Sequence, residues 1–241
     1  MSQAPPSKKR LLLISNSTLH GSGYLDHAAP EIRDFLGDVK RVLFVPFALR
    51  DQDGYAAQAR KRFQAMGYEL DSIHQLEDAK HAVDNAEAIF IGGGNTFRLL
   101  NRLYQTDLLL PIRRRVEDGM PYSGSSAGAV VSAPTIKTTN DMPIVQPPSF
   151  NSLDLIPFQI NAHYLDPDPK STHMGETREE RLIQFLEDNE TPVVGLREGS
   201  MIRVERGVYR LKGRTNARIF RRGLDPFELK PGATLDLLFE P

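Results

Sequence analysis

Short apolar runs alternate with amphipathic segments over the first hundred residues. The runs are bounded by turn residues, and their spacing predicts strands at 10–15, 41–47, 68–73 and 86–91. Helical spacing of apolar positions predicts helices at 27–36, 53–66 and 78–85, the second followed by Gly67. Near-continuous Leu, Ile, Val and Phe in several strands favours a doubly wound α/β fold, in which helices cover both faces of a mostly parallel sheet.

The pattern changes near the C-terminus. Residues 200–211 alternate apolar and polar positions around a Glu205–Arg206–Gly207 turn, which predicts an antiparallel hairpin that extends or flanks the main sheet. We expect residues 9–241 to form a single domain and residues 1–8 to be a disordered tail.

Composition narrows the classes of partner. The chain has 241 residues, with 30 basic and 31 acidic side chains, and this balance predicts neither nucleic-acid nor membrane binding. The apolar run after Lys8–Arg10 is too short for a signal peptide or a membrane span. The absence of cysteine excludes disulfides and thiolate chemistry and fits a cytoplasmic protein. We expect small-molecule substrates and a monomer or homodimer.

Two glycine-rich segments follow predicted strands, where parallel sheets place their functional crevice. The segment IFIGGGNTFRLL (89–100) matches no phosphate-binding motif, so no nucleotide cofactor is expected, and Asn95 is placed to cap the following helix. The segment YSGSSAGAVVS (122–132) contains G-x-S-x-G centred on Ser126, the strand-to-helix turn that exposes a nucleophilic serine. Its plain alternative is a turn of small residues.

A nucleophilic serine needs amide donors, a base and an acid. The N–H of Ala127 is the expected first oxyanion donor, and that of Gly94 could be the second. Among six histidines, His163 stands out because it ends the apolar run 158–164. Glu198 and Asp141 both follow suitable segments and compete as the acid that orients the base, although either could be a solvated turn residue.

Several segments together resemble the peptidase E family, the α-aspartyl dipeptidases, which are related to cyanophycinase and share a fold like that of the class I glutamine amidotransferases. The matching segments span about residues 11–200 and include LLLISNSTL, VLFVPFA, IGGGNTFRLL, GSSAGAVVSAPTIKTTNDMPIV, LDLIPFQINAHY, GETREERL and GLREGS. The resemblance implies a cytoplasmic serine peptidase that removes N-terminal aspartate from dipeptides without a metal or other cofactor.

The resemblance also implies site roles. Ser126 corresponds to the nucleophile, His163 to the base and Glu198 to the acid, while Asp141 has also been placed in the charge relay. Gly94 and Ala127 fall on the oxyanion positions. The sequence departs from the family pattern at Ser125, where an aromatic residue is expected, and in the loop 164–175. The resemblance therefore does not specify the residues at the edge of the substrate pocket.

Selection of aspartate requires a cation for its side chain. Thr177 and Glu180 form a T-x-x-E capping box, which puts Arg178 at the first helical position, where a positive charge opposes the helix dipole. We expect Arg178 to bind the substrate carboxylate, with Asn95 also contacting substrate. Asp141 or Glu176 would accept the substrate ammonium.

Three other functions stay open. A metal-dependent hydrolase could use His163, Asp166, Asp168, His173 and Glu176, although their spacing matches no fixed metal motif. A non-catalytic protein could hold a small acidic ligand in the same crevice. Within the peptidases, cleavage of β-linked aspartyl substrates, as by cyanophycinase, is the remaining alternative.

Overall fold

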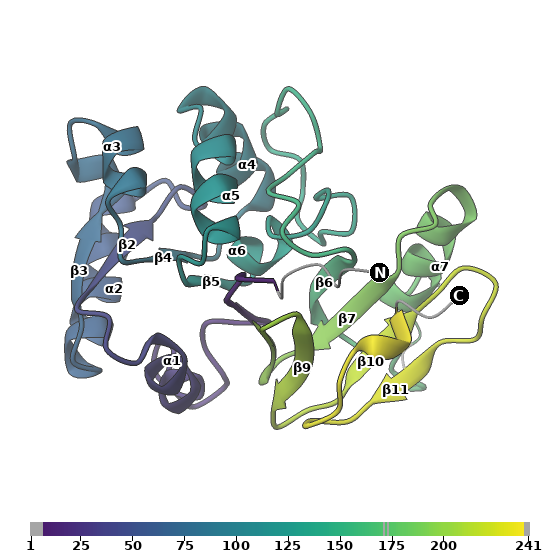
Figure 1. Cartoon of the computed structure of the whole chain (residues 1–241). Coiled ribbons are helices and arrows are strands. Elements are labelled where there is room, and N and C mark those ends of the chain that lie inside the picture. Colours follow the sequence, from purple (N-terminus) through teal and green to yellow (C-terminus); the bar gives the residue numbers. More distant parts are fainter. Residues whose placement is uncertain (1–6, 171, 173, 239–241) are drawn as a thin grey trace, which may run out of the picture.

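The computed structural model describes residues 7–170, 172 and 174–238. Part of the predicted tail, residues 1–6, therefore lies outside the described residues. The described chain forms the following helices and strands (Figure 1): β1 (Leu11–Ile14), α1 (Ala29–Leu36), β2 (Arg41–Val45), α2 (Gln52–Ala65), β3 (Glu69–Ser72), η1 (Ile73–Gln75), α3 (Ala79–Asp84), β4 (Ala88–Ile91), α4 (Thr96–Gln105), α5 (Leu109–Glu117), β5 (Tyr122–Ser125), α6 (Ala127–Val130), β6 (Gln159–Tyr164), α7 (Arg178–Asp188), β7 (Val193–Arg197), β8 (Ser200–Glu205), β9 (Val208–Gly213), β10 (Ala217–Phe220), β11 (Phe227–Leu229) and η2 (Asp236–Leu238).

The larger sheet has seven strands in the order β3-β2-β4-β5-β1-β8-β9. Its first five strands pair in parallel, whereas β8 pairs antiparallel with β1 and β9 pairs antiparallel with β8. The predicted α/β fold is thereby confirmed. The predicted hairpin is also present, and it extends the main sheet from the edge of β1.

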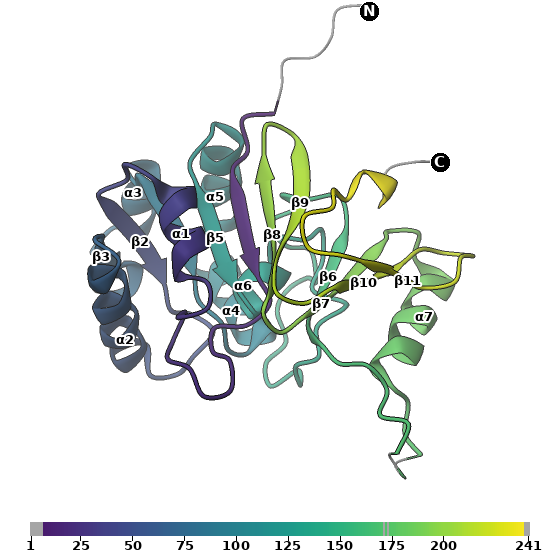
Figure 2. The ribbon, with the colours of Figure 1, turned by 90° about the horizontal axis from the view of Figure 1, so that it is seen from below.

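A second sheet contains four strands in the order β11-β10-β7-β6, which the sequence pattern did not indicate. β6 and β7 are parallel and are connected through α7, whereas β10 and β11 continue the sheet antiparallel. Figure 2 shows these strands and α7 to one side of the larger sheet. The strands that end near His163 and Glu198 therefore belong to a different sheet from β5.

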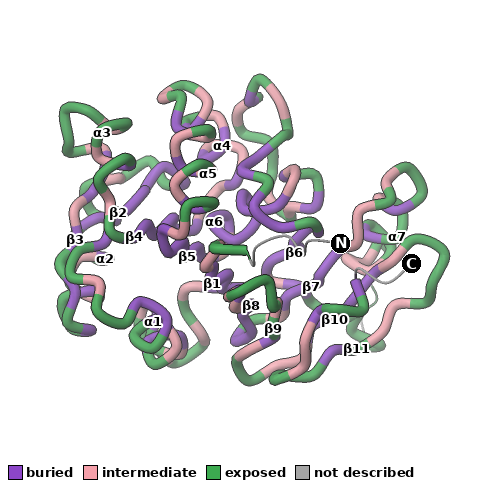
Figure 3. The backbone as a smooth tube through the Cα atoms, viewed as in Figure 1, coloured by how far each residue is buried: buried purple, intermediate pink, exposed green. Residues whose placement is uncertain are grey.

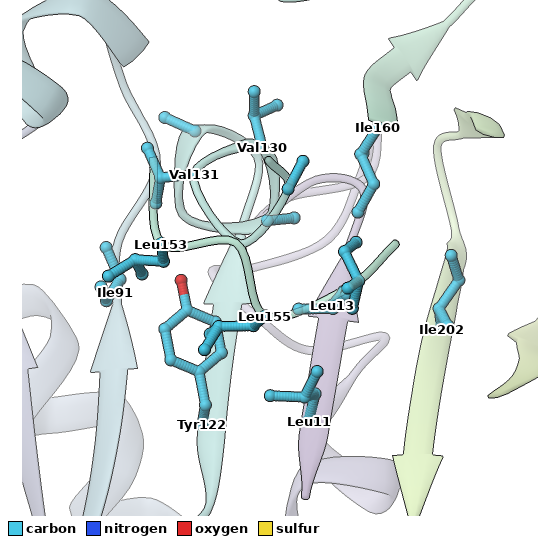
Figure 4. Close-up of a cluster of buried hydrophobic side chains, with 14 of the residues drawn as sticks. Leu11, Leu13, Ile91, Tyr122, Val130, Val131, Leu153, Leu155, Ile160 and Ile202 are labelled. Carbon is cyan, nitrogen blue, oxygen red and sulfur yellow. The ribbon is translucent and has the colours of Figure 1, made fainter. Parts of the chain in front are cut away.

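Helices cover both faces of the larger sheet, and the residues of β1 alternate between two cores. Leu11 and Leu13 pack with α4, α5 and α6, while Leu12 and Ile14 pack with α1 and α2. Figure 3 draws much of the central strands in purple, the colour of buried residues. Figure 4 shows Leu11 and Leu13 beside Tyr122 in the first of these cores. Both faces of β1 are fully buried, as expected for a central strand of a doubly wound sheet.

The described residues include no helix that is both long enough and apolar enough to cross a membrane.

Candidate active site

The turn at Ser126 is as tight as G-x-S-x-G predicts. Ser126 links β5 to α6 with φ of +52°, in the left-handed region that residues other than glycine rarely adopt. A Cβ at Gly128 would lie 2.1 Å from the carbonyl oxygen of Ile91, and one at Gly124 would lie 2.3 Å from that of Gly128. Both glycines are therefore steric requirements of this turn.

Three side chains form a continuous hydrogen-bonded chain. His163 Nε2 lies 2.8 Å from Ser126 Oγ, and His163 Nδ1 lies 2.8 Å from Glu198 Oε1. Ser126 follows β5, His163 lies in β6 at a register shift, and Glu198 follows β7, so the chain joins the two sheets. The side chains of His163 and Glu198 are 39% and 51% exposed, so a substrate can reach these hydrogen-bonded groups. The arrangement is that of a nucleophile, a base and an orienting acid.

Asp141 lies at the same cleft but binds another element. Its Oδ2 accepts hydrogen bonds from the N–H and the hydroxyl of Thr96, at 2.7 and 2.6 Å, at the start of α4. The Thr139 hydroxyl donates to that of Thr96 at 3.0 Å. The carboxylate bonded to His163 is that of Glu198, so the geometry gives Asp141 no place in the charge relay.

Of the two expected oxyanion donors, one is the first residue of a helix and the other precedes the N-cap of a helix. Ala127 is the first residue of α6, where N–H groups have no partner within the helix. Gly94 adopts φ of +131° just before α4, and a Cβ there would lie 2.8 Å from the carbonyl oxygen of Ala48. Within the described part of the chain, neither N–H donates a hydrogen bond to another residue. Neither amide is therefore occupied by an acceptor from the described residues.

Gly93 is a site residue that the sequence did not single out among three consecutive glycines. A Cβ at Gly93 would lie 3.0 Å from Ser126 Cβ and 3.2 Å from the carbonyl oxygen of Ser125. Glycine at this position thus lets the 92–95 loop approach the nucleophile closely. These distances, rather than the sequence, show which of the three glycines faces the serine.

A cleft of about 630 Å³ opens over Ser126 and His163 and is also lined by Asp141, Arg178 and Glu198. The predicted capping box is present at the start of α7, and Arg178 is the first residue of that helix. Burial lowers the pKa of the Arg178 guanidinium, although Glu198 opposes this effect. Its Nη1 is buried and has no hydrogen-bond partner among the described residues. Arg178 is therefore a partly desolvated cation in the cleft.

Two predicted substrate contacts lie elsewhere. Asn95 caps α4, as expected, by accepting from the N–H of Arg98 at 3.0 Å, and its amide donates to the carbonyl of Met142 at 2.9 Å. Glu176 is exposed and lies 3.8 Å from Arg181 Nε. Neither residue is among those that line the cleft, and their contact with substrate stays a prediction. Ser125 is also fully buried and outside the cleft, so it does not form the pocket edge.

An ion network that the sequence did not indicate forms one wall of the cleft. Arg197 donates to both oxygens of Asp166, at 2.7 and 2.6 Å, and to both oxygens of Glu228, at 2.9 Å each. The hydrogen bonds from Arg197 lower the pKa of both carboxyl groups. The guanidinium also lies over the Tyr164 ring, 5.4 Å from its centroid. The start of the 165–177 segment is thereby tied to the second sheet.

The metal-site alternative finds no geometric support in the described part of the chain. His173 lies outside the described residues. Among the remaining histidines and carboxylates that the structure describes, no group of three or more is placed to hold a metal ion. Asp166 is instead paired with Arg197.

Comparisons with known proteins point to one family. Residues 11–212 match the model of peptidase family S51. The chain is 53% identical to peptidase E of Streptomyces coelicolor over 95% of both chains, and 49% identical to a probable α-aspartyl dipeptidase of Drosophila melanogaster over 97% of this chain and 99% of the relative. The crystal structure of a peptidase from an acI-B1 actinobacterium shares the fold, with a TM-score of 0.70 at 18% identity over 94% of this chain and 96% of that one. The chain thus belongs to peptidase family S51.

Proposed function

We propose that this peptidase removes N-terminal aspartate from dipeptides through an aspartyl ester on Ser126. The observation that supports the proposal most directly is the shared cleft: the Ser126–His163–Glu198 chain and the partly desolvated cation of Arg178 open onto the same space. The similarity to proteins named peptidase E and α-aspartyl dipeptidase gives the same substrate class.

The hydrogen bonds define the order of proton transfers. His163 Nε2 accepts the proton of Ser126 Oγ as that oxygen attacks the peptide carbonyl, and Glu198 accepts the hydrogen bond from Nδ1–H and stabilises the imidazolium. The N–H groups of Ala127 and Gly94 receive the developing oxyanion. His163 then donates the proton to the departing amino acid, and a water molecule hydrolyses the ester by the same route.

Arg178 supplies recognition of the aspartate side chain. A carboxylate can accept two parallel hydrogen bonds from one guanidinium, and its charge compensates a cation that burial disfavours. The N-terminus of α7 adds the positive end of its dipole at the same place. Neutral N-terminal residues leave Arg178 uncompensated, so they bind less well.

Asp141 is the better of the two candidates for the substrate ammonium, because it lines the cleft whereas Glu176 does not. Its Oδ2 is used by Thr96, and its Oδ1 is left to accept a hydrogen bond from a bound amine. Asp141→Asn is expected to raise KM for Asp-Leu by about tenfold, the cost of about 1.4 kcal/mol for one charge-assisted contact. A succinyl analogue, which lacks the ammonium, should be processed equally by both proteins.

The decisive experiment compares Asp-Leu, β-Asp-Leu and Ala-Leu as substrates of the wild type and of Ser126→Ala. We expect hydrolysis of Asp-Leu alone, unaffected by EDTA, and a fall of about 10⁴-fold or more in Ser126→Ala. Preference for β-Asp-Leu would identify the cyanophycinase-like activity instead. Binding of Asp-Leu without turnover would identify a non-catalytic protein, and inhibition by EDTA a metal-dependent one.

A cytoplasmic location and a monomeric or homodimeric state complete the proposal. The location is supported by the absence of cysteine from the chain. Sedimentation of the purified protein, with fractionation of cells that express it, would test both predictions.

A further inference from the structure

Three consecutive residues at the end of β1 each accept a hydrogen bond from a backbone N–H at or next to a member of the Ser126–His163–Glu198 triad. The carbonyl of Ile14 accepts from the N–H of Ser126 at 2.9 Å. The hydroxyl of Ser15 accepts from the N–H of His163 at 3.0 Å. The side-chain oxygen of Asn16 accepts from the N–H of Gly199, the residue after the acid, at 2.8 Å. β1 is the strand of the larger sheet at which these contacts meet.

The hydroxyl of Ser15 both accepts and donates a hydrogen bond. Besides accepting from His163, it donates to the carbonyl of Leu196 in β7 at 2.6 Å. The side chain is fully buried. One hydroxyl therefore joins the strand of the base to the strand that leads to the acid, at the junction of the two sheets.

The backbone of His163 needs such a contact. His163 has φ of +53°, and the register of β6 with β7 shifts between Ala162 and Tyr164 on either side of it. Non-glycine residues with positive φ persist only where the surrounding structure fixes them. The bond from the His163 N–H to Ser15 is a contact of the larger sheet that fixes this conformation.

We propose that Ser15 is a positioning residue of the peptidase, and that Asn16 supports it by holding the turn after Glu198. Ser15 does not touch the substrate; it sets the backbone of His163 so that the imidazole bridges Ser126 and Glu198. This inference rests on the proposed function only in requiring that these three residues form the catalytic triad.

Removal of the hydroxyl has a specific consequence. Ser15→Ala leaves the N–H of His163 and the carbonyl of Leu196 without their partner in a buried place. The backbone at His163 can then relax from the left-handed region and move the imidazole away from Ser126 Oγ. A misplacement of about 1 Å can lower a rate by about 100-fold. Because the Arg178 contact is untouched, substrate binding stays the same.

The test measures kcat and KM for Asp-Leu in Ser15→Ala, Ser15→Thr and Ser152→Ala. Ser152 is the matched control: its buried hydroxyl donates to the carbonyl of Val131 at 2.6 Å and lies outside the cleft. We expect kcat of Ser15→Ala to fall by about 100-fold with KM within about twofold, kcat of Ser152→Ala to change by less than about threefold, and Ser15→Thr to recover most of the rate by restoring the hydroxyl. The reaction of Ser126 with an uncharged fluorophosphonate should slow in parallel with kcat.

Wild-type kcat in Ser15→Ala would overturn the proposal, as would an equal loss in Ser152→Ala. If Ser15→Ala does not fold, Ser15→Cys replaces it, because the thiol occupies similar space but makes only weak hydrogen bonds. The same two results then decide the question. Failure of the proposed function is distinguishable: full activity of Ser126→Ala would remove the triad itself, whereas an inactive Ser126→Ala with an active Ser15→Ala refutes positioning alone.

Discussion

Replacement of Arg178 by methionine separates recognition of aspartate from stability of the fold. Methionine keeps most of the length and apolar contact of the arginine stem but removes its charge and donors. In the structure the guanidinium is partly buried, its pKa is lowered by burial, and its Nη1 has no partner among the described residues. Removal of the guanidinium therefore breaks no hydrogen bond of Nη1 to the described residues.

The expected loss follows from the contact that is removed. Loss of one partner of a hydrogen-bonded charge pair costs about 2–5 kcal/mol when the pair is desolvated. Because Arg178 is only half-buried, we take the lower part of that range, about 2–3 kcal/mol, which corresponds to a fall of about 30- to 150-fold in kcat/KM for Asp-Leu. An uncharged ester that acylates Ser126 has no carboxylate to lose, so its kcat/KM should change by less than about threefold.

Although kcat/KM for Asp-Leu should fall in Arg178→Met, the free energy of unfolding should rise. Arginine at the first position of α7 opposes the helix dipole, at a cost of about 0.3–1 kcal/mol, and carries a buried donor without a partner. Arg178→Met should therefore raise the free energy of unfolding by about 1 kcal/mol, which raises Tm by about 2–4 °C for a chain of this size.

Kinetics on both substrates and a thermal melt complete the assay, with Arg181→Met as the control. Arg181 lies one turn further along α7, is exposed, and lies near Glu176. Its replacement should leave both kcat/KM values unchanged. The reasoning is refuted if Arg178→Met loses the same factor on the neutral ester, or if its Tm falls, because either result would assign Arg178 to folding.

Three further predictions address the triad, the turn and the cleft wall. Glu198→Gln should lower kcat by about 10³- to 10⁴-fold because the base loses its orienting carboxylate, whereas Asp141→Asn should act mainly on KM; steady-state kinetics that showed the reverse would exchange the two roles. Gly128→Ala should destabilise the protein by about 3 kcal/mol in urea, because its Cβ would lie 2.1 Å from a backbone oxygen of β4, and a loss below about 1 kcal/mol would contradict the tight turn. Arg197 lowers the pKa of Asp166 chiefly by hydrogen bonding, so the pair stabilises the fold above the unfolded pKa of about 3.9 and this stabilisation is lost as pH falls through the folded pKa. The free energy of unfolding of Asp166→Asn should thus be below that of the wild type by about 1 kcal/mol near pH 6, with the difference shrinking toward pH 3; a difference independent of pH would exclude the ion pair as its cause.

Local rules explain why some parts of the structure were predictable from sequence. The helix expected at 78–85 is present as Ala79–Asp84 with Asp78 as its N-cap, because capping depends on residues within one turn. The capping box at Thr177 and the turn at Ser126 are predictable for the same reason. Asn95 shows the limit of such reasoning, since its helix-capping signal is confirmed whereas its predicted contact with substrate does not follow from residues within one turn.

The second sheet and the role of Ser15 depend on contacts far apart in sequence. The apolar runs of β6 and β7 indicate buried strands, but periodicity does not specify which strand pairs with which. Likewise, Ser15 is an ordinary small residue at the end of a strand until His163, 148 positions later, is placed against its hydroxyl. The network around Arg197 was not predicted for the same reason, because its partners come from separate segments.

The triad residues come from two sheets, and two of them have a positive φ that needs support from a neighbouring element. Ser126 and His163 both adopt positive φ, at a cost of about 1–3 kcal/mol each, and each is held by a hydrogen bond from its own N–H to the end of β1. A change in the angle between the sheets would move the nucleophile relative to the base unless one element contacted both. β1 meets that requirement because it pairs with β5 on one edge and presents Ser15 to β6 and β7 beyond its end. The geometry of catalysis is therefore set at the end of a central strand, away from the cleft that the substrate enters.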